Sequence, residues 1–415
     1  MSEGAKLAAL FIAVVLAAVS MFAVFSDESL PKKLSDAVHE ETRADEGGCE
    51  VSEAEEMRAV WVTYKEIGEM VRGKSRAEYE ACVDEMLSAL SELGINTLFW
   101  HVRAFCDALY LKTEFPVSEY ICAQNGRPPD YDPLAIIIEK CKTADIRVHA
   151  WVNPFRVCAD KSKIPESGKI GELLAHDGVY YTAANGVWLD PASELSRQSV
   201  LDGIAELCDN YAIAGIQFDD YYYTSDSAEK SCAAYEEYKA CGGSMGVKQW
   251  RTEGLSAFIA SVYSFIKSKN ENLVFSISPG GIPEKALNES LADVYEWCAG
   301  GYADVIIPQI YYGFENETAP FEQIAKKWAE LCRGGDVRLV CGLAAYKCGV
   351  TDEFAGSGKN EWVENNGILS AEYSVISNIA EYSGFSLFSY GYCVGENGND
   401  ISGTEINSLK SMLKY

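Results

Sequence analysis

The chain has 415 residues, with 62 Asp or Glu against 35 Lys or Arg, which gives a formal charge of -27 at pH 7. A chain this acidic repels the phosphate backbone, and we expect no nucleic-acid partner. Hydrophobic residues make up 48% and charged residues 23%. This composition is typical of a globular protein with a sizeable core, and it excludes a disordered chain, a collagen and a polytopic membrane protein.

The N-terminal part differs in composition from the rest of the chain. Residues 5–25 form an apolar run whose only charge is Lys6, which is long enough to cross a bilayer. We therefore expect residues 1–25 to export the chain to the cell envelope, either as a signal peptide or as an uncleaved anchor that makes the only membrane contact. Residues 26–57, rich in Asp, Glu and Ser, predict an acidic disordered linker. Residues 58–415 are predicted to form one domain.

Cysteine and histidine usage argues against a metal site. Most of the 14 Cys lie inside apolar patterns, which predicts buried free thiols rather than disulfides. The chain has only 4 His, and it contains no C-x-x-C, H-x-H or H-E-x-x-H pattern. We therefore expect no zinc site and no cofactor.

From Arg58 onward, short β-branched or aromatic runs alternate with longer segments of helical period. This pattern predicts an α/β fold in which eight βα units close a (β/α)8 TIM barrel. The competing open doubly wound sheet lacks its usual G-x-G-x-x-G turn after the first strand. Long insertions are predicted after strands two, three and four, at 105–132, 156–188 and 224–245. The predicted strands are 59–64, 95–103, 146–155, 213–222, 273–279, 303–312, 338–345 and 385–392, and the predicted helices are 76–93, 133–144, 194–211, 247–269, 290–299, 321–331, 371–382 and 404–413.

Side-chain alternation along each strand predicts which residues point into the barrel. In strand four, Ile216 and Phe218 form the apolar outer set, which turns Asp219 inward at the strand end. Polar groups converging at one rim favour a ligand site, because buried polar groups cost free energy unless they are paired. The alternative is a self-satisfied network, for example an ion pair between Arg103 and Asp219. The residues predicted to face inward in strands two, three, four and six are His101, Arg103, His149, Trp151, Asn153, Gly215, Gln217, Asp219, Gln309 and Tyr311.

Asp219 is the principal candidate for a catalytic carboxylate. A nearby guanidinium and hydrogen-bond donors favour its ionised form, which suits a nucleophile or base. Glycosidic cleavage normally needs a second carboxylate. Asp190 and Asp220 are the candidates of choice, although Asp190 before Pro191 also suits a helix N-cap, and Asp220 points away from Asp219 unless the strand ends one residue earlier. Asp107 and Glu284 are further candidates for this partner.

Several multi-residue motifs in this order resemble the glycosyl-hydrolase-like family ten barrels. They are Phe99-Trp100-His101-Val102-Arg103, Asp107-Ala108-Leu109-Tyr110, His149-Ala150-Trp151-Val152-Asn153-Pro154, Trp188-Leu189-Asp190-Pro191, Gly215-Ile216-Gln217-Phe218-Asp219-Asp220-Tyr221 and Pro308-Gln309-Ile310-Tyr311. The resemblance implies a (β/α)8 glycoside hydrolase of bacterial envelopes, some members of which act on peptidoglycan glycan strands. It carries over the strand-four motif with Asp219 and Asp220, the strand-two Arg103 and the strand-three Asn153.

The sequence therefore predicts an exported glycoside hydrolase whose partner is a bacterial cell-wall or related polysaccharide. Two alternatives stay open. One is a glycan-binding barrel without turnover, and the other is a hydrolase that uses Asp219, Asp220 and Asp190 as ligands for Ca²⁺ or Mg²⁺. The candidate substrate-binding residues are His101, Arg103, Asp107, Trp151, Asn153, Gln217, Tyr222, Gln309, Tyr311 and Tyr390.

Overall fold

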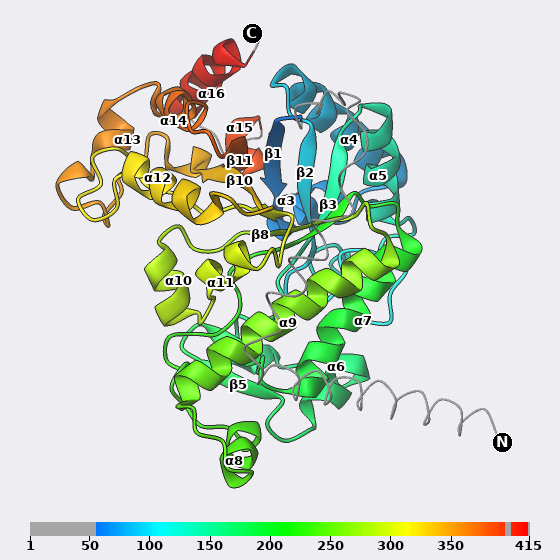
Figure 1. Cartoon of the computed structure of the whole chain (residues 1–415). Coiled ribbons are helices and arrows are strands. Elements are labelled where there is room, and N and C mark those ends of the chain that lie inside the picture. Colours follow the sequence, from blue (N-terminus) through cyan, green and yellow to red (C-terminus); the bar gives the residue numbers. More distant parts are fainter. Residues whose placement is uncertain (1–54, 395–399, 414–415) are drawn as a thin grey trace, which may run out of the picture. The chain divides into compact units, whose positions relative to one another are not determined.

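A computed structural model describes residues 55–394 and 400–413. These residues contain a closed barrel of eight parallel strands, surrounded by helices (Figure 1). The predicted TIM barrel is thus confirmed, and the open doubly wound sheet is excluded. Around the barrel the strands are β1 (Met57–Val62), β2 (Thr97–Arg103), β3 (Arg147–Val152), β7 (Gly215–Phe218), β8 (Val274–Ile277), β9 (Val305–Ile306), β10 (Arg338–Leu343) and β11 (Tyr382–Phe388), which pairs back with β1.

The barrel interior is a packed core in its lower part. Alternate residues of the strands meet there, among them Ala59, Trp61, Phe99, Val305 and Val340, in a cluster separate from the larger core between strands and helices. This alternation follows from the two-residue period of a strand. Several observed strands are shorter than predicted at their C-terminal ends. The polar residues that end the motifs therefore belong to loops.

Several barrel helices begin at a residue whose side chain caps the first turn. Ser75 caps α4 with a reciprocal bond to Glu78, and Asp132 caps α5 ahead of Pro133. A helix that the sequence did not predict, α3, follows β1 directly. The helices are α3 (Tyr64–Val71), α4 (Arg76–Glu92), α5 (Pro133–Thr143), α7 (Glu194–Asn210), α9 (Val247–Lys269), α10 (Pro283–Glu289), α11 (Val294–Ala299), α12 (Phe321–Cys332), α13 (Glu361–Glu364), α14 (Ile368–Ile376), α15 (Tyr390–Cys393) and α16 (Asp400–Met412).

The segments after β3 and β7 contain small elements of their own. Between β3 and α7 lie α6 (Gly168–Leu174) and an antiparallel sheet of β4 (Arg156–Cys158), β6 (Gly186–Leu189) and β5 (Tyr180–Ala183). The segment after β7 contains α8 (Ala233–Ala240). None of these small elements was predicted from the sequence.

The predicted leader and most of the predicted linker lie outside the described residues. β1 begins at Met57, one residue before the predicted start of the domain. No helix in the described part of the chain is both long and apolar enough to span a bilayer. The 13 cysteines of this part are free thiols, most of them buried, in agreement with the prediction from their apolar surroundings.

Candidate functional site

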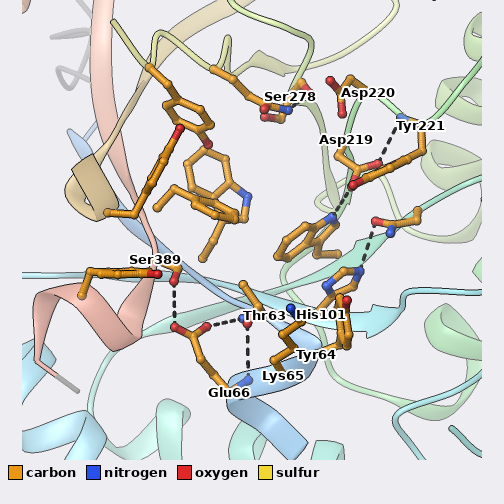
Figure 2. A pocket seen from close by; sticks show the side chains of 18 of the residues that line it. Thr63, Tyr64, Lys65, Glu66, His101, Asp219, Asp220, Tyr221, Ser278 and Ser389 are labelled. Atoms are coloured by element: carbon orange, nitrogen blue, oxygen red, sulfur yellow. Dashed lines mark hydrogen bonds between the residues drawn. The ribbon is translucent and has the colours of Figure 1, made fainter. Parts of the chain in front are cut away.

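A cavity of about 640 Å³ opens at the C-terminal ends of the barrel strands, where barrel enzymes place their active sites. Its volume lies in the range of small-molecule sites. Figure 2 shows Asp219, Asp220 and Tyr221 on one side of it and Thr63 to Glu66 of the α3 region on another. The lining residues are Trp61, Thr63, Tyr64, Lys65, Glu66, Glu69, His101, Trp151, Asn153, Arg156, Asp219, Asp220, Tyr221, Ser278, Gln309, Tyr311, Tyr346, Phe388, Ser389 and Tyr392.

The carboxylate pair follows β7, which ends at Phe218. Asp219 is 3% exposed, and its two carboxylate oxygens accept hydrogen bonds from Trp151 Nε1 at 3.0 Å and from the backbone N–H of Tyr221 at 3.3 Å. Because the strand stops before this pair, the next residue does not alternate to the outer face. Asp220 also borders the cavity, so both neighbouring carboxylates face the same space.

Burial is the largest influence on the pKa of both carboxyl groups. It raises the pKa of Asp219 well above its usual range, and the charge of Asp220 raises it further, while the bonds from Trp151 and Tyr221 and the Arg156 guanidinium only partly offset this. The pKa of Asp220 is also raised by burial. Both shifts favour the protonated form of the pair. The guanidinium expected beside Asp219, Arg103, lies elsewhere, and desolvation outweighs the charge of Arg156, so the pKa of Asp219 shifts against the expected ionised form.

Three further predicted residues form a connected wall beside Asp219. The His101 and Trp151 rings stack with centroids 3.7 Å apart, and His101 Nε2 lies 3.1 Å from Asn153 Oδ1. Asn153 Nδ2 donates to the backbone oxygen of Ala104 at 3.0 Å, which fixes its orientation. Burial lowers the pKa of His101 to about 3, so its ring is neutral. His101 therefore offers a hydrogen bond and a ring face, not a charge.

On the other side of the carboxylate pair, Gln309 and Tyr311 border the cavity as the alternation predicted. Gln309 Nε2 donates to the backbone oxygen of Ser278 at 3.1 Å. Gln217 points into the barrel below the cavity, where its Oε1 accepts from Trp61 Nε1 at 3.2 Å. Gln217 thus supports the cavity floor and does not border it.

Arg103 does not reach the cavity. The pairing of β2 with β3 shifts between His101 and Arg103, so that one extra residue turns Arg103 to the outer face. There its guanidinium carbon lies 3.8 Å from the centroid of the Phe115 ring. The proposed ion pair between Arg103 and Asp219 is therefore absent, because a bulge reverses the alternation from which it was inferred.

Asp190 also lies outside the cavity. It forms a buried ion pair with Arg251, with Nη1 2.9 Å from Oδ1 and Nη2 3.3 Å from Oδ2. Its Oδ1 accepts from the backbone N–H of Ala192 as well, while Ser193 is the residue that caps α7. Asp190 therefore cannot join Asp219 and Asp220 around one ion, and no group of three or more His, Cys, Asp or Glu within residues 55–394 and 400–413 is placed to hold a metal.

The remaining predicted residues have other neighbours. Asp107 Oδ1 accepts from the backbone N–H of Phe105 at 3.0 Å and so shapes the loop after β2. Tyr222 is fully buried against Trp297, with ring centroids 5.4 Å apart. Glu284 lies on α10 and pairs with Lys327. None of these residues borders the cavity, and neither does Tyr390, whose place is taken by Tyr392.

Arg156 is a cavity residue that the sequence did not single out as a site residue. Its guanidinium carbon lies 4.8 Å from the Tyr221 ring centroid and 5.0 Å from that of Phe105. Its Nε is buried without a hydrogen-bond partner among the described residues. Arg156 lies two residues after the motif that ends with Asn153 and Pro154, and this position is the signal that could have identified it.

Glu66 is a second cavity residue that sequence reasoning missed. Its Oε2 accepts from the backbone N–H of Thr63 at 2.7 Å, and its Oε1 accepts from Ser389 Oγ at 2.7 Å (Figure 2). Oε1 also accepts from the backbone N–H of Gly391 at 2.6 Å. The capping box Thr63-x-x-Glu66 was the available signal. Because both oxygens are occupied, Glu66 organises the wall and is poorly placed to react.

Comparison with known proteins gives a consistent family match. Residues 56–359 match the profile of the family described as glycosyl hydrolase-like 10. The glycosyl hydrolase DigH of Escherichia coli K12 is 30% identical over 348 residues, which cover 77% of this chain and 77% of that protein. The glycosyl hydrolase YngK of Bacillus subtilis 168 is 26% identical over 312 residues, which cover 70% of this chain and 61% of that protein.

Solved structures share the architecture at low sequence identity. The glycoside hydrolase domain of PgaB (BpsB) from Bordetella bronchiseptica superposes with a TM-score of 0.58 at 12% identity, over 86% of this chain and 98% of that one. The alpha-L-fucosidase isoenzyme 2 of Paenibacillus thiaminolyticus gives 0.55 at 9% identity, over 86% of this chain and 49% of that one. At such identities the likeness concerns the fold alone.

Proposed function

The chain belongs to the glycosyl hydrolase-like 10 family, and from this membership and the geometry of the cavity we propose that it hydrolyses glycosidic bonds in a bacterial cell-wall polysaccharide. The observation that carries the proposal is the adjacent pair Asp219 and Asp220 in one cavity, with the pKa of both raised by burial. A carboxyl group that keeps its proton at neutral pH is what a glycosidase needs to protonate a leaving oxygen.

In the proposed reaction Asp219 is the general acid. Its carboxyl proton passes to the glycosidic oxygen as the bond from that oxygen to the anomeric carbon breaks, and Asp219 becomes a carboxylate. Asp220 faces the same space and supplies negative charge beside the oxocarbenium-like centre that develops. Water then completes the hydrolysis at the anomeric carbon, and its proton returns to the carboxylate pair.

The cavity walls suit a sugar ring. Phe388 lies among other rings, with centroid distances of 5.7 Å to Tyr311, 5.9 Å to Trp61 and 6.0 Å to Tyr346. Ring faces cover the C–H faces of pyranoses, while the amides of Asn153 and Gln309 suit hydroxyl groups. The second carboxylate beside Asp219 favours hydrolysis over glycan binding without turnover, because a binding module has no need for it.

The test is hydrolysis of glycan strands prepared from peptidoglycan, with the products separated by chromatography. Asp219→Asn removes the proton donor and should lower the rate about 100-fold to 10,000-fold, with glycan affinity nearly unchanged. Asp177→Asn, on an exposed residue of the segment before α7, is the matched control and should keep full activity. A folded wild type that binds these strands and never cleaves them would support the binding-module alternative instead.

We also propose that residues 1–25 carry the barrel to the cell envelope. The support is the apolar run 5–25 followed by an acidic segment without a comparable apolar run. The full chain should fractionate with membranes if the run is retained as an anchor, and it should be found free outside the cytoplasm if the run is cleaved. Retention of the full chain in the cytoplasm would contradict export.

A further inference from the structure

Two smaller hollows adjoin the central cavity and share lining residues with it. The first, which we call the α3 hollow, has a volume of about 400 Å³ and is bordered by Lys65, Gly68, Glu69, Arg72 and Tyr120. Lys65 and Glu69 also line the central cavity. The hollow and the cavity are therefore adjacent at these two side chains.

The second hollow lies beyond the carboxylate pair. This β8 hollow has a volume of about 180 Å³, and its border includes Asp220, Gly280, Lys285, Glu289 and Tyr312. Asp220 is the residue that it shares with the central cavity. Figure 2 shows Lys65 and Asp220 at different borders of that cavity, so the two hollows adjoin it at separate places.

From this arrangement we propose that the three spaces form one continuous groove that holds an extended glycan, with the reacting bond beside Asp219 and Asp220 and sugar residues bound on both sides. The proposal rests on the proposed hydrolase function and deepens it, because it makes the enzyme an endo-acting one. A site that cuts at a chain end needs a closed wall beyond one or two sugars. Here both directions away from the carboxylate pair lead into further space.

The α3 hollow has side chains suited to a sugar. Tyr120 joins it to the cavity through Tyr64, with ring centroids 4.5 Å apart. Arg72 is held by its Nε and Nη2, which donate to the backbone oxygens of Tyr120 at 3.2 Å and Glu119 at 3.1 Å. An orientated guanidinium beside a tyrosine ring gives a sugar both hydrogen-bond donors and an apolar edge.

Glycine keeps the β8 hollow open next to the reacting groups. A Cβ added at Gly280 would find Asp220 Oδ2 at 3.9 Å as its sole near neighbour, which is an ordinary contact. Alanine therefore fits at this position. A larger side chain would extend into the space where the hollow meets the cavity, and so provides a means of closing one arm of the groove.

The experiment measures products and rates with defined peptidoglycan-derived oligosaccharides of two to eight sugars, some blocked at both chain ends. Wild type should cleave the blocked octasaccharide internally and should show kcat/KM rising with chain length, because binding energy from remote sugars lowers the barrier. Gly280→Leu should lower kcat/KM on the octasaccharide about 10-fold or more, with Gly280→Ala as the matched control. Lys65→Gln and Arg72→Gln should lower it about 5-fold to 10-fold, with the exposed Arg127→Gln as control.

Loss of cleavage on blocking the ends, or equal kcat/KM for short and long chains, would overturn the groove while leaving the hydrolase function intact. If wild type cleaves none of these glycans, the hydrolase function on this polymer fails, and calorimetry with the same oligosaccharides still tests the groove. Affinity should then rise with chain length and fall in Gly280→Leu and Arg72→Gln. An affinity that is independent of chain length, or no binding, would refute the extended groove.

Discussion

Replacing Arg251 with methionine should lower the free energy of unfolding by about 3–5 kcal/mol, the cost of leaving a buried charge without its partner. Asp190 and Arg251 are 5% and 3% exposed and make two bonds to each other. Arg251 also donates to the backbone oxygen of Lys230 at 3.1 Å, and Tyr223 Oη lies 3.4 Å from Asp190 Oδ1. Methionine keeps much of the length of the side chain but satisfies none of these acceptors.

The matched control is an exposed pair of the same chemistry. Arg333 Nε lies 2.7 Å from Glu381 Oε1 at the surface, where Arg333→Met should change stability far less than Arg251→Met does, because solvent screens an exposed pair. Asp190→Asn should be costly by itself, and the double variant with Arg251→Met should lose less than the sum of the two. The pair should show a coupling of about 1–3 kcal/mol in a double-mutant cycle.

Urea unfolding followed by circular dichroism measures these differences, and hydrolysis per folded molecule is measured in parallel. Because Asp190 lies outside the cavity, the double variant should keep the wild-type kcat on glycan strands at a temperature where it is folded. A well-folded Asp190→Asn protein without activity would place Asp190 in the reaction and refute the structural interpretation of the pair.

The other predictions concern titration and the displaced arginine. Since Asp219 donates in its protonated form and Asp220 acts as a carboxylate, kcat/KM should fall toward acid as Asp220 gains a proton and toward alkali as Asp219 loses its own; a profile without the alkaline fall would show that Asp219 reacts in its ionised form. Glu372 is fully buried on α14 with neither oxygen hydrogen-bonded among the described residues, and burial raises its pKa well above the usual range. In the unfolded chain it ionises above about pH 4.3, so wild type loses stability as pH rises from there toward the folded-state pKa. Glu372→Gln should remove this loss, and equal urea midpoints of the two proteins at pH 7 would count against it. Arg103→Met should keep glycan hydrolysis while lowering stability, because its guanidinium packs on Phe115; a stable but inactive variant would return Arg103 to the site.

The sequence was sufficient to predict the parts of this molecule that depend on local pattern. All eight barrel strands follow from alternation between short apolar runs and helical segments, and the two-residue period correctly turned Trp151, Asn153 and Gln309 toward the cavity. The predicted helix 133–144 is also present, as α5 (Pro133–Thr143). These features depend on residues close together in the chain, where one sequence contains the necessary information.

Features that depend on irregular backbone, or on residues far apart in the chain, could not be predicted from local sequence pattern. A single extra residue in β2 turned Arg103 outward, and the early end of β7 brought Asp220 into the cavity. The partner of Asp190 is 61 positions away, so its ion pair carries no local signal. The protonation of Asp219 depends on burial by many groups at once, which no linear motif records.

The bonds of Glu66 to Ser389 and Gly391 join segments 323 and 325 positions apart and have a consequence for the order in which the molecule is made. Thr63 and Glu66 leave the ribosome among the first folded residues, whereas β11 and α15 leave among the last. Until then one side of the cavity has no wall, and Phe388, Ser389 and Tyr392 are missing from it. A nascent chain that has folded its first seven barrel strands therefore cannot hold substrate as the finished protein does. The protein can therefore bind substrate only after its last strand has been added. A chain truncated before residue 382 should be an inactive fragment, even if Asp219 and Asp220 are correctly placed in it.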